Sequence, residues 1–350
     1  MSSRLDLTSG DLSALLAPEP AFRARQVRLG LLKGLDPSEM TDLSLDLRHR
    51  LSSLLPAPLR VERELVGEGA MTLKWLWALA DGAHIETVLM HYPHRSTVCV
   101  STQAGCAMGC SFCATGQMGF LRHLSAGEIV EQVTYARRAA HPRRLSNVVF
   151  MGMGEPLANY EATIAAATTI QGELAISARH ITVSTVGVAP GIRRLAREAL
   201  PVNLAVSLHA AHDELRNTLV PLNRRYPLAE LMDACEEYRG LKGRRVSFEW
   251  ALIDDVNDGP DEARRLIALA RPLRAHVNLI PLNPTQGYRA NATAAERAGA
   301  FCRQLVAGGI EATVRANRGR DIDAACGQLA LPTRARRTSV DQAGSDDAIL

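Results

Sequence analysis

The sequence has few lysines, few aromatic residues and no long apolar run. Only Lys33, Lys74 and Lys242 are lysines, aromatic residues make up 4% of the 350 residues, and the formal net charge is +3. So small a charge is no evidence for a particular partner, and the excess of arginine fits a codon bias as well as it fits phosphate and base contacts. Because no stretch of about eighteen apolar residues occurs, we expect no membrane-spanning segment.

The first twenty residues lack the apolar segment of a signal peptide and contain acidic residues, so we expect a cytoplasmic protein. Thiols stay reduced in the cytoplasm, and clustered cysteines there indicate a metal or catalytic site rather than disulfide bonds. An apolar fraction of 47% is ordinary for a globular protein. The length allows one large domain and a smaller one.

The pattern along the chain changes from helices to strands and then to a repeated alternation of strand and helix. The alternation begins near residue 96, and Ser125 and Glu128 form a capping box that marks the start of its first long helix. Such alternation predicts an α/β fold with a parallel sheet and a site at the carboxyl ends of its strands. We expect a helical segment over residues 1–58, a β extension over 59–95, a core over 96–332 and a disordered polar tail over 333–350. Apolar runs predict strands over residues 59–66 and 84–92 in the extension, and over 97–102 at the start of the core.

Four of the seven cysteines fall within a short segment near residue 100. Cys106, Cys110 and Cys113 make a C-x3-C-x2-C run, and Cys99 lies seven residues before it. The chain lacks the second C-x2-C pair that a structural zinc site would use. Three cysteines suit an iron–sulfur cluster with one open iron, whereas zinc with a distant fourth ligand and a chance match remain alternatives on spacing alone.

The run, with Phe112 before its last cysteine, resembles the signature of the radical S-adenosylmethionine (SAM) enzymes. In that family SAM chelates the open iron of a [4Fe-4S] cluster, and one electron cleaves it to a 5′-deoxyadenosyl radical. The stretch "NVVFMGMGEPLANY" resembles the motif that meets the amino group of SAM. Taken singly, a serine or asparagine at a strand end more often caps a turn, and a lone histidine more often packs in a core. The resemblance implies SAM contacts from Gly154, Glu155, Ser184, Ser207, Leu208, His209 and Asn283.

Together with "RGRDIDAACGQLA", these segments resemble the radical-SAM adenine methyltransferases of ribosomal and transfer RNA, over about residues 20–330. The resemblance implies a partial (β/α)6 barrel with a small N-terminal helical accessory domain that binds RNA. It implies methylation of carbon 2 of an adenosine in the peptidyl-transferase centre of 23S rRNA, with tRNA adenosine 37 as a second target. Methylation at carbon 8 is the alternative within the class, and a non-catalytic zinc-bearing RNA-binding protein is the alternative outside it.

The family mechanism implied for this chain uses two SAM molecules per turnover and two further cysteines. Cys326 would accept a methyl group as S-methylcysteine, and Cys99 would resolve the RNA adduct through a transient disulfide with Cys326. Glu86 matches the proton acceptor, although Cys99 competes for that role and a solvent-facing strand carboxylate is the plainer interpretation of Glu86. The expected partners are RNA, an electron donor such as flavodoxin and no membrane, and we expect a monomer.

Overall fold

The computed structural model describes residues 3–285, 287–315 and 319–329, and the tail expected to be disordered, residues 333–350, lies outside this range. The helices are α1 (Ser9–Leu16), α2 (Phe22–Leu32), α3 (Leu45–Leu54), α4 (Ala114–Met118), α5 (Ala126–Ala140), α6 (Tyr160–Gly172), α7 (Ala189–Arg197), α8 (Asp213–Leu219), α9 (Leu228–Lys242), α10 (Pro260–Leu273) and α11 (Ala295–Ala307). The strands are β1 (Leu59–Val66), β2 (Thr72–Leu79), β3 (His84–Tyr92), β4 (Arg95–Cys99), β5 (Gln103–Gly105), β6 (Phe120–His123), β7 (Leu145–Phe150), β8 (Ile181–Thr185), β9 (Asn203–Ser207), β10 (Val246–Leu252), β11 (His276–Pro281) and β12 (Glu311–Val314).

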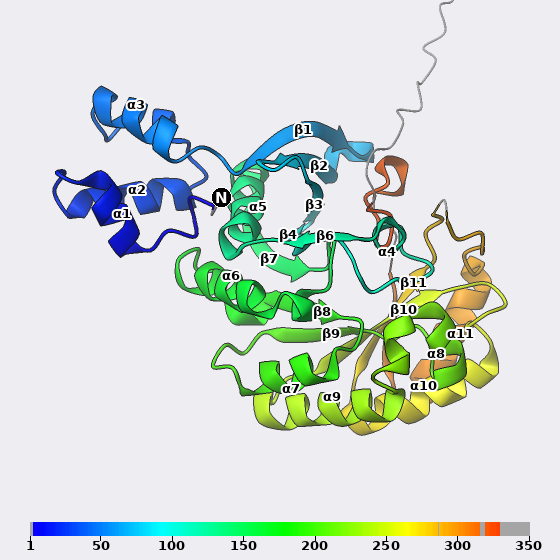
Figure 1. The fold of residues 1–350 in the computed structure, drawn as a ribbon. Coiled ribbons are helices and arrows are strands. Elements are labelled where there is room, and N and C mark those ends of the chain that lie inside the picture. The colour runs from blue at the N-terminus through cyan, green and yellow to red at the C-terminus, as the bar shows by residue number, and fades with distance from the viewer. Residues whose placement is uncertain (1–2, 286, 316–318, 330–350) are drawn as a thin grey trace, which may run out of the picture.

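Within the described residues, ten strands form one curved sheet in the order β1-β2-β3-β4-β7-β8-β9-β10-β11-β12. The first four pair in antiparallel fashion, and from β4 to β12 every pairing is parallel. Helices connect successive parallel strands and cover the outer face of the sheet (Figure 1). The expected α/β fold with a partial (β/α)6 barrel is therefore confirmed.

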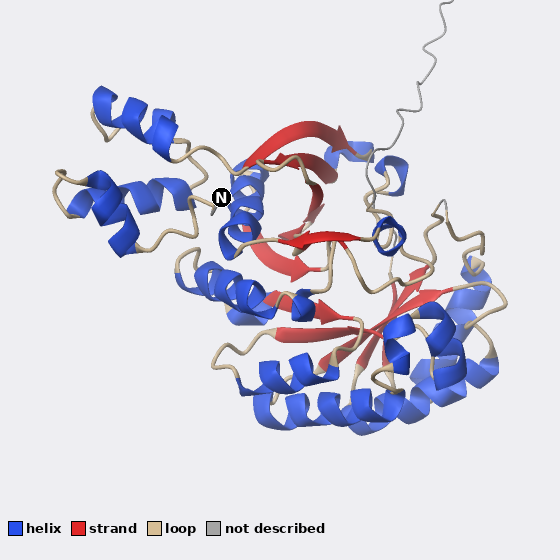
Figure 2. Cartoon of the chain, viewed as in Figure 1, coloured by secondary structure: helices blue, strands red, loops and turns tan. Residues whose placement is uncertain are grey.

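Strand β10 shows why this sequence folds as a barrel wall. Phe248 and Trp250 are fully buried on the outer face, and the Trp250 ring stacks at 6.1 Å on Phe301 of α11. Glu249 and Ala251 alternate with them and line the barrel interior. Because successive side chains of a strand point to opposite faces, one face joins the apolar layer under the helices while the other supplies functional groups. Figure 2 shows the strands inside and the helices outside.

Helices α1–α3 lie to one side of the barrel, next to α5 and α6 (Figure 1). Buried Arg4 donates to both Glu131 of α5 and Asp36. Arg28 of α2 forms a two-point ion pair with Glu173, at 2.7 and 3.0 Å. These ion pairs hold the N-terminal helices on the barrel. No helix among the described residues combines the length and the apolarity needed to cross a bilayer.

Strand β4 ends at Cys99, whereas the sequence predicts a strand that continues to Thr102. Val100 still bonds to β7, but the amides of Thr102 and Gln103 both donate to the Met153 carbonyl, at 2.8 and 3.1 Å. This shared acceptor turns the chain out of the barrel and into β5, from which the cysteine run follows.

Candidate active site

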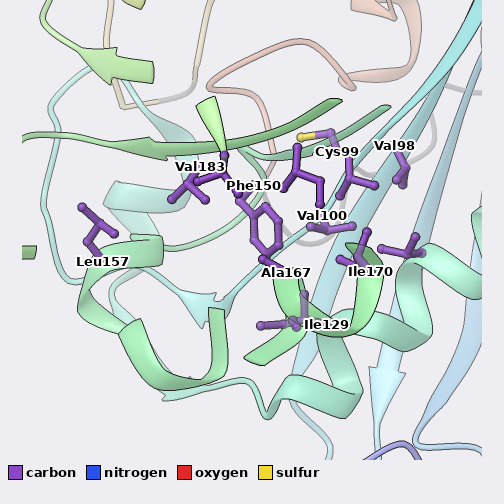
Figure 3. Close-up of a cluster of buried hydrophobic side chains, with 14 of the residues drawn as sticks. Val98, Cys99, Val100, Ile129, Phe150, Leu157, Ala167, Ile170 and Val183 are labelled. Carbon is purple, nitrogen blue, oxygen red and sulfur yellow. The ribbon is translucent and has the colours of Figure 1, made fainter. Parts of the chain in front are cut away.

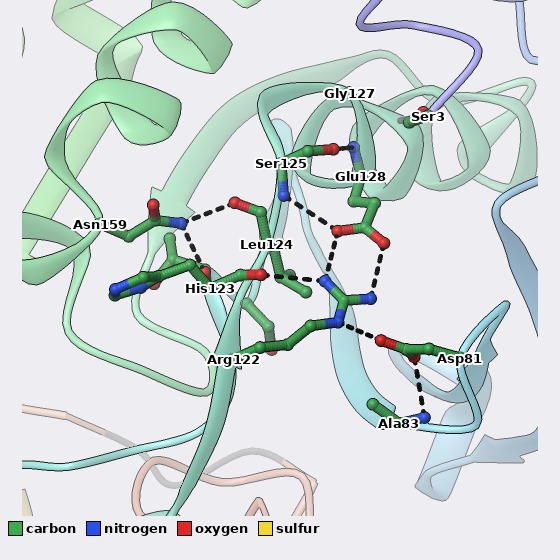
Figure 4. A network of polar contacts seen from close by, with 12 residues as sticks. Ser3, Asp81, Ala83, Arg122, His123, Leu124, Ser125, Gly127, Glu128 and Asn159 are labelled. Atoms are coloured by element: carbon green, nitrogen blue, oxygen red, sulfur yellow. Dashed lines mark hydrogen bonds and ion pairs between the residues drawn. The ribbon is translucent and has the colours of Figure 1, made fainter. Parts of the chain in front are cut away.

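The cysteine run lies in a loop closed at its base by the two-stranded sheet of β5 and β6. Arg122 of β6 anchors this base, as Figure 4 shows: its Nη1 and Nη2 each donate to a different carboxylate oxygen of Glu128 at 2.8 Å, and its Nε pairs with Asp81. Ser125 caps α5 and Glu128 accepts from the Ser125 amide at 2.9 Å, which confirms the predicted capping box. The loop is thus fixed to α5 and to the turn between β2 and β3.

One cavity at the carboxyl ends of the barrel strands, here called the outer cavity, gathers most of the predicted site residues. It is lined by Cys106, Cys110 and Cys113, by Gly154, Glu155, Ser184, Ser207, His209 and Asn283, and by Cys326. Leu208, Cys99 and Glu86 do not line it. A second, larger cavity of about 710 Å³, here called the inner cavity, lies inside the barrel and is lined by Cys99, Cys113 and Cys326 among others.

The three cysteines of the run suit a four-iron cluster more closely than a single ion. In the described part of the chain, no three histidine, cysteine, aspartate or glutamate side chains are grouped tightly enough to hold one metal ion. Thiolates on a tetrahedral zinc lie 2.3 Å from the metal and hence only about 4 Å from one another. In a cluster each cysteine binds a different iron, which spreads the sulfurs. Burial raises the pKa of Cys106 to about 11, which favours the neutral thiol while no metal is bound. Bound iron would favour the thiolate instead, because its positive charge lowers the pKa of a coordinating thiol.

Gly154 and Glu155 follow β7 and line the outer cavity together with the cysteines. Gly154 has φ +102°, and a Cβ there would lie 2.6 Å from the Gln103 side chain, so only glycine fits. Glu155 is buried and accepts from the amides of Leu157 and Val186 at 2.9 and 2.8 Å. Loss of hydration raises its pKa to about 7, although these hydrogen bonds act in the opposite direction. A carboxylate held in this way can accept hydrogen bonds from an amino group in the cavity.

Ser184, Ser207 and His209 reach the outer cavity from the ends of β8 and β9. The Ser184 hydroxyl donates to the Phe150 carbonyl at 2.6 Å. His209 Nδ1 accepts from the Ala251 amide at 2.9 Å, and burial lowers the pKa of His209 to about 3, so the ring is neutral and carries its proton on Nε2. The Leu208 side chain is fully buried and lines neither cavity, so this residue contributes its backbone to the structure of the site.

Cys326 lies in a segment that several distant parts of the chain hold in place. Asn283 donates its side-chain amide to the Cys326 carbonyl at 3.0 Å. At the start of α4, the Ala114 amide donates to Gly327 O at 2.8 Å and the Thr115 hydroxyl to Leu329 O at 2.6 Å. The thiol is exposed to both cavities, yet the surrounding protein raises its pKa above the usual range.

Cys99 lies in the barrel wall at the end of β4, beside the apolar residues Val98 and Val100 (Figure 3). Burial raises the pKa of its thiol, and Cys326 raises it further, as expected of two thiols in one cavity. All seven cysteines are free, so the expected disulfide between Cys99 and Cys326 is not present.

Glu86 of β3 is buried at 2% exposure, which excludes a solvent-facing strand carboxylate. Its Oε1 lies 2.8 Å from Lys74 Nζ on the neighbouring β2, and that lysine also donates to the Asp323 carbonyl at 2.9 Å. Glu86 lines neither cavity. The structure therefore connects Glu86 to the Cys326 segment through Lys74.

Sequence reasoning missed two buried charged residues beside the site. Arg216 of α8 is 1% exposed, and its guanidinium donates to the carbonyls of Val186, Ser207 and Leu208 and to Asn223. Glu249 of β10 lines both cavities. A charged residue in a short helix or strand normally indicates solvent exposure, so composition and spacing held no signal for either.

Comparison with known proteins agrees with this geometry. Residues 100–267 match the model of the radical SAM superfamily. Proteins named "Probable dual-specificity RNA methyltransferase RlmN" from Parafrankia sp. (strain EAN1pec) and from Chloroflexus aurantiacus are 53% and 50% identical to this chain. The alignments cover 91% and 93% of this chain and 88% and 92% of those proteins.

A solved structure agrees as well. The crystal structure of a radical SAM methyltransferase from Sphaerobacter thermophilus superimposes with a TM-score of 0.90 at 51% identity, covering 94% of this chain and 99% of that one. The chain therefore belongs to the radical SAM superfamily and, within it, to the family of RlmN-type dual-specificity RNA methyltransferases.

Proposed function

We propose that this protein methylates a carbon atom of an adenosine in RNA, with Cys326 as the residue that carries the methyl group. The observation behind this proposal is the position of Cys326, which lines the same cavity as Cys106, Cys110 and Cys113 although it follows them by more than two hundred residues. A carbon within an adenine amidine is not nucleophilic and cannot displace a methyl group from SAM. A thiolate is nucleophilic, so transfer through Cys326 overcomes this difficulty.

The residues of the outer cavity fit the cofactor. Glu155 would accept from the amino group of SAM, the His209 Nε2–H would donate into the same cavity, and the three cysteines would hold a [4Fe-4S] cluster. When bound, the cluster and two SAM molecules per turnover would supply the methyl group and the radical chemistry that activates it, with the electron drawn from an external donor such as flavodoxin. The serines at the ends of β8 and β9, Ser184 and Ser207, would complete the cradle together with Asn283 and the backbone of Leu208.

Release of the methylated RNA would use Cys99 and Glu86. Cys99 faces the inner cavity that also exposes Cys326, so its thiolate could attack the Cys326 sulfur. This attack would form the disulfide and break the bond between that sulfur and the methylene carbon on the base, which would leave with the electron pair and take up a proton to become the methyl group. The two thiols are free in this structure, so both are available for this step. Glu86 would accept the ring proton, and Lys74 joins it to Asp323 in the Cys326 segment, although Glu86 lines neither cavity in this structure and the base would have to approach it. Cys99 remains the competing proton acceptor.

The target proposed is carbon 2 of an adenosine in the 23S rRNA peptidyl-transferase centre, with tRNA adenosine 37 as a second target. The printed name of the relatives, dual-specificity RNA methyltransferase, supports more than one RNA target. Carbon 8 of the same rRNA base is the alternative. Residues 1–58 would serve as an accessory RNA-binding unit, although Arg28 is engaged with Glu173 and is a poor candidate for an RNA contact.

Nucleoside analysis of rRNA and tRNA from a deletion strain tests the proposal. We expect 2-methyladenosine to disappear and to return with the wild-type gene but not with C326A. Because Cys302 lies on the outer helix α11 and donates to the Ala312 carbonyl, C302A is the matched cysteine control and should restore the modification. Loss of 8-methyladenosine instead would select the alternative target, and unchanged methyladenosine would refute the proposal.

A second experiment tests the roles of the two cysteines. Protein purified without oxygen from cells that express C99A should carry an RNA fragment bound to Cys326, detected by mass spectrometry after nuclease digestion. The double variant C99A/C326A should carry none. An adduct-free C99A protein that still methylates RNA would contradict the resolving role of Cys99.

A further inference from the structure

Glu249 occupies the boundary between the two cavities. It is 7% exposed, points inward from β10, and lines both the outer and the inner cavity, as do Cys113 and Cys326. Cys106 and Cys110 line only the outer cavity. The order through the barrel is therefore Cys106 and Cys110, then Cys113, Cys326 and Glu249 at the boundary, and then the inner cavity. A methyl group carried on Cys326 would pass to a substrate on the inner side of this boundary.

Glu249 is paired with Asn278 on the neighbouring strand. The two residues are direct partners in the register of β10 and β11, and Asn278 Nδ2 donates to Glu249 Oε1 at 2.8 Å. With the amide nitrogen directed at the carboxylate, the pair presents its other oxygens, one carboxylate and one amide, as acceptors. Burial raises the pKa of Glu249, while Arg315 and the Asn278 hydrogen bond act in the opposite direction. Two adjacent acceptors match a group with two N–H donors.

The inner cavity has the size and charge to admit part of an RNA chain. Its volume of about 710 Å³ lies within the range of small-molecule sites. Among the described residues that line it, Glu249 is the only acidic one, whereas Arg95, Arg244, Arg245 and Arg315 are cationic. Arg245 pairs with Glu311, so Arg244, which lies five residues and about 16 Å before Glu249 along the chain, is the better phosphate contact. A phosphate at Arg244 and a base at Glu249 would thus fit one nucleotide drawn into the barrel.

We infer that Glu249 and Asn278 form the subsite that binds the exocyclic amino group of the target adenine. This inference rests on the proposed function and adds to it the residues that select the base. Enzymes that act on a base read it through hydrogen bonds to its edge once it has left the stack. An acceptor pair favours adenine, which carries an amino group at carbon 6, over hypoxanthine, which carries an oxygen there, and over purine, which carries neither.

The test compares three RNA substrates with the wild type and E249Q. The substrates are one RNA stem-loop carrying adenosine, inosine or purine riboside at the methylated position, and the readout is kcat/KM for methyl transfer. The wild type should prefer adenosine to purine riboside by about 10- to 100-fold, as expected for a hydrogen bond to a charged acceptor. E249Q presents an amide nitrogen in place of an oxygen, so this preference should fall to within about 3-fold and inosine should gain relative to adenosine.

Three controls separate base selection from other roles. SAM affinity, measured by equilibrium dialysis, and iron content should stay within about 2-fold in E249Q. N278A should reduce the preference for adenosine in the same way, which covers the case that E249Q does not fold. Glu237 lies on the outer helix α9 and pairs with Arg193 at 2.7 Å, so E237Q is the matched control and should keep the full preference.

Two results would overturn the inference. One is an equal loss on adenosine and purine riboside in both variants. The other is a parallel loss of SAM affinity, which would assign Glu249 to the cofactor. A wild-type protein that cleaves SAM but methylates no adenosine in RNA would instead refute the proposed function.

Discussion

Replacement of Lys74 by methionine should destabilise the protein more than any change at an exposed ion pair. The side chains of Lys74 and Glu86 are 2% and 3% exposed, and their charged atoms lie 2.8 Å apart. In K74M the Glu86 carboxylate would remain buried without this cation, which costs about 3–5 kcal/mol. Loss of the Lys74 hydrogen bond to Asp323 O would add about 1 kcal/mol. Against a total stability of about 5–15 kcal/mol, this is a large fraction.

The double variant K74M/E86Q separates the buried charge from the lost packing. It removes the negative charge that Lys74 faces in the wild type, so we expect it to recover at least half of the K74M loss. Arg264 and Asp261 form an ion pair on the surface of α10, with side chains 71% and 73% exposed. R264M is therefore the control, and it should change the free energy of unfolding by less than about 1 kcal/mol.

Urea unfolding of the cluster-free protein, followed by far-ultraviolet circular dichroism without oxygen, measures these differences from the shift in midpoint at constant slope. A slower alkylation of wild-type Cys326 than of Cys326 in K74M would show in addition that Lys74 orders the Cys326 segment. A K74M loss below about 1 kcal/mol, or equal losses in K74M and K74M/E86Q, would refute the reasoning, because the buried carboxylate would then carry no penalty.

Three further outcomes are expected. In G105A the added Cβ would lie 2.0 Å from the Gly119 carbonyl oxygen, whereas in G109A it would meet open space. G105A should therefore bind less iron after reconstitution than G109A. Equal iron content in the two variants would contradict the close contact between Gly105 and Gly119. The pKa of Glu155 is raised to about 7, so its ionised fraction rises about tenfold from pH 6 to 8. Over this range SAM affinity should therefore increase about tenfold more in the wild type than in E155Q. An equal increase in both proteins would exclude Glu155 as the acceptor. R216M leaves several buried acceptors without their donor, at about 1–3 kcal/mol each, and should lower the thermal midpoint by several degrees, whereas an unchanged midpoint would show that water replaces the guanidinium.

The fold could be predicted from the sequence because its apolar pattern is locally unambiguous. The run from Leu59 to Val66 and the run from His84 to Tyr92 are strands with the predicted bounds, and Ser125 caps α5 as predicted. The early end of β4 could not be predicted. Val100–Thr102 continue the alternation of a strand, and only the carbonyl of Met153, which lies beyond β7, turns the chain away. The local apolar pattern thus predicts the bounds of a strand only where no residue distant in the sequence forms hydrogen bonds with its backbone.

The site was less predictable than the fold because some of its residues are charged and yet buried, whereas charged residues usually lie at the surface. Cysteine spacing indicated three of the residues that line the outer cavity, and the resemblance to the radical SAM methyltransferases implied seven more. Lys74, Arg216 and Glu249 are charged residues in ordinary elements, and nothing in their spacing indicates that they are buried. Their burial follows from where α8, β2 and β10 meet the barrel mouth, which depends on tertiary packing.

The contacts around Cys326 give a physical reason why the cysteine run and the Cys326 segment belong to one site. Ala114 and Thr115, the two residues after Cys113, donate to the carbonyls of Gly327 and Leu329, which both follow Cys326 within three residues. Any shift of the cysteine loop that strains α4 must therefore loosen the residues that flank the Cys326 thiol. Conversely, a ligand that orders Cys113 also orders the segment, because the two share hydrogen bonds over a sequence separation of more than two hundred residues. The order of the Cys326 segment should consequently depend on whether the cysteine run is occupied, even though Cys326 is not itself one of the three cysteines of the run.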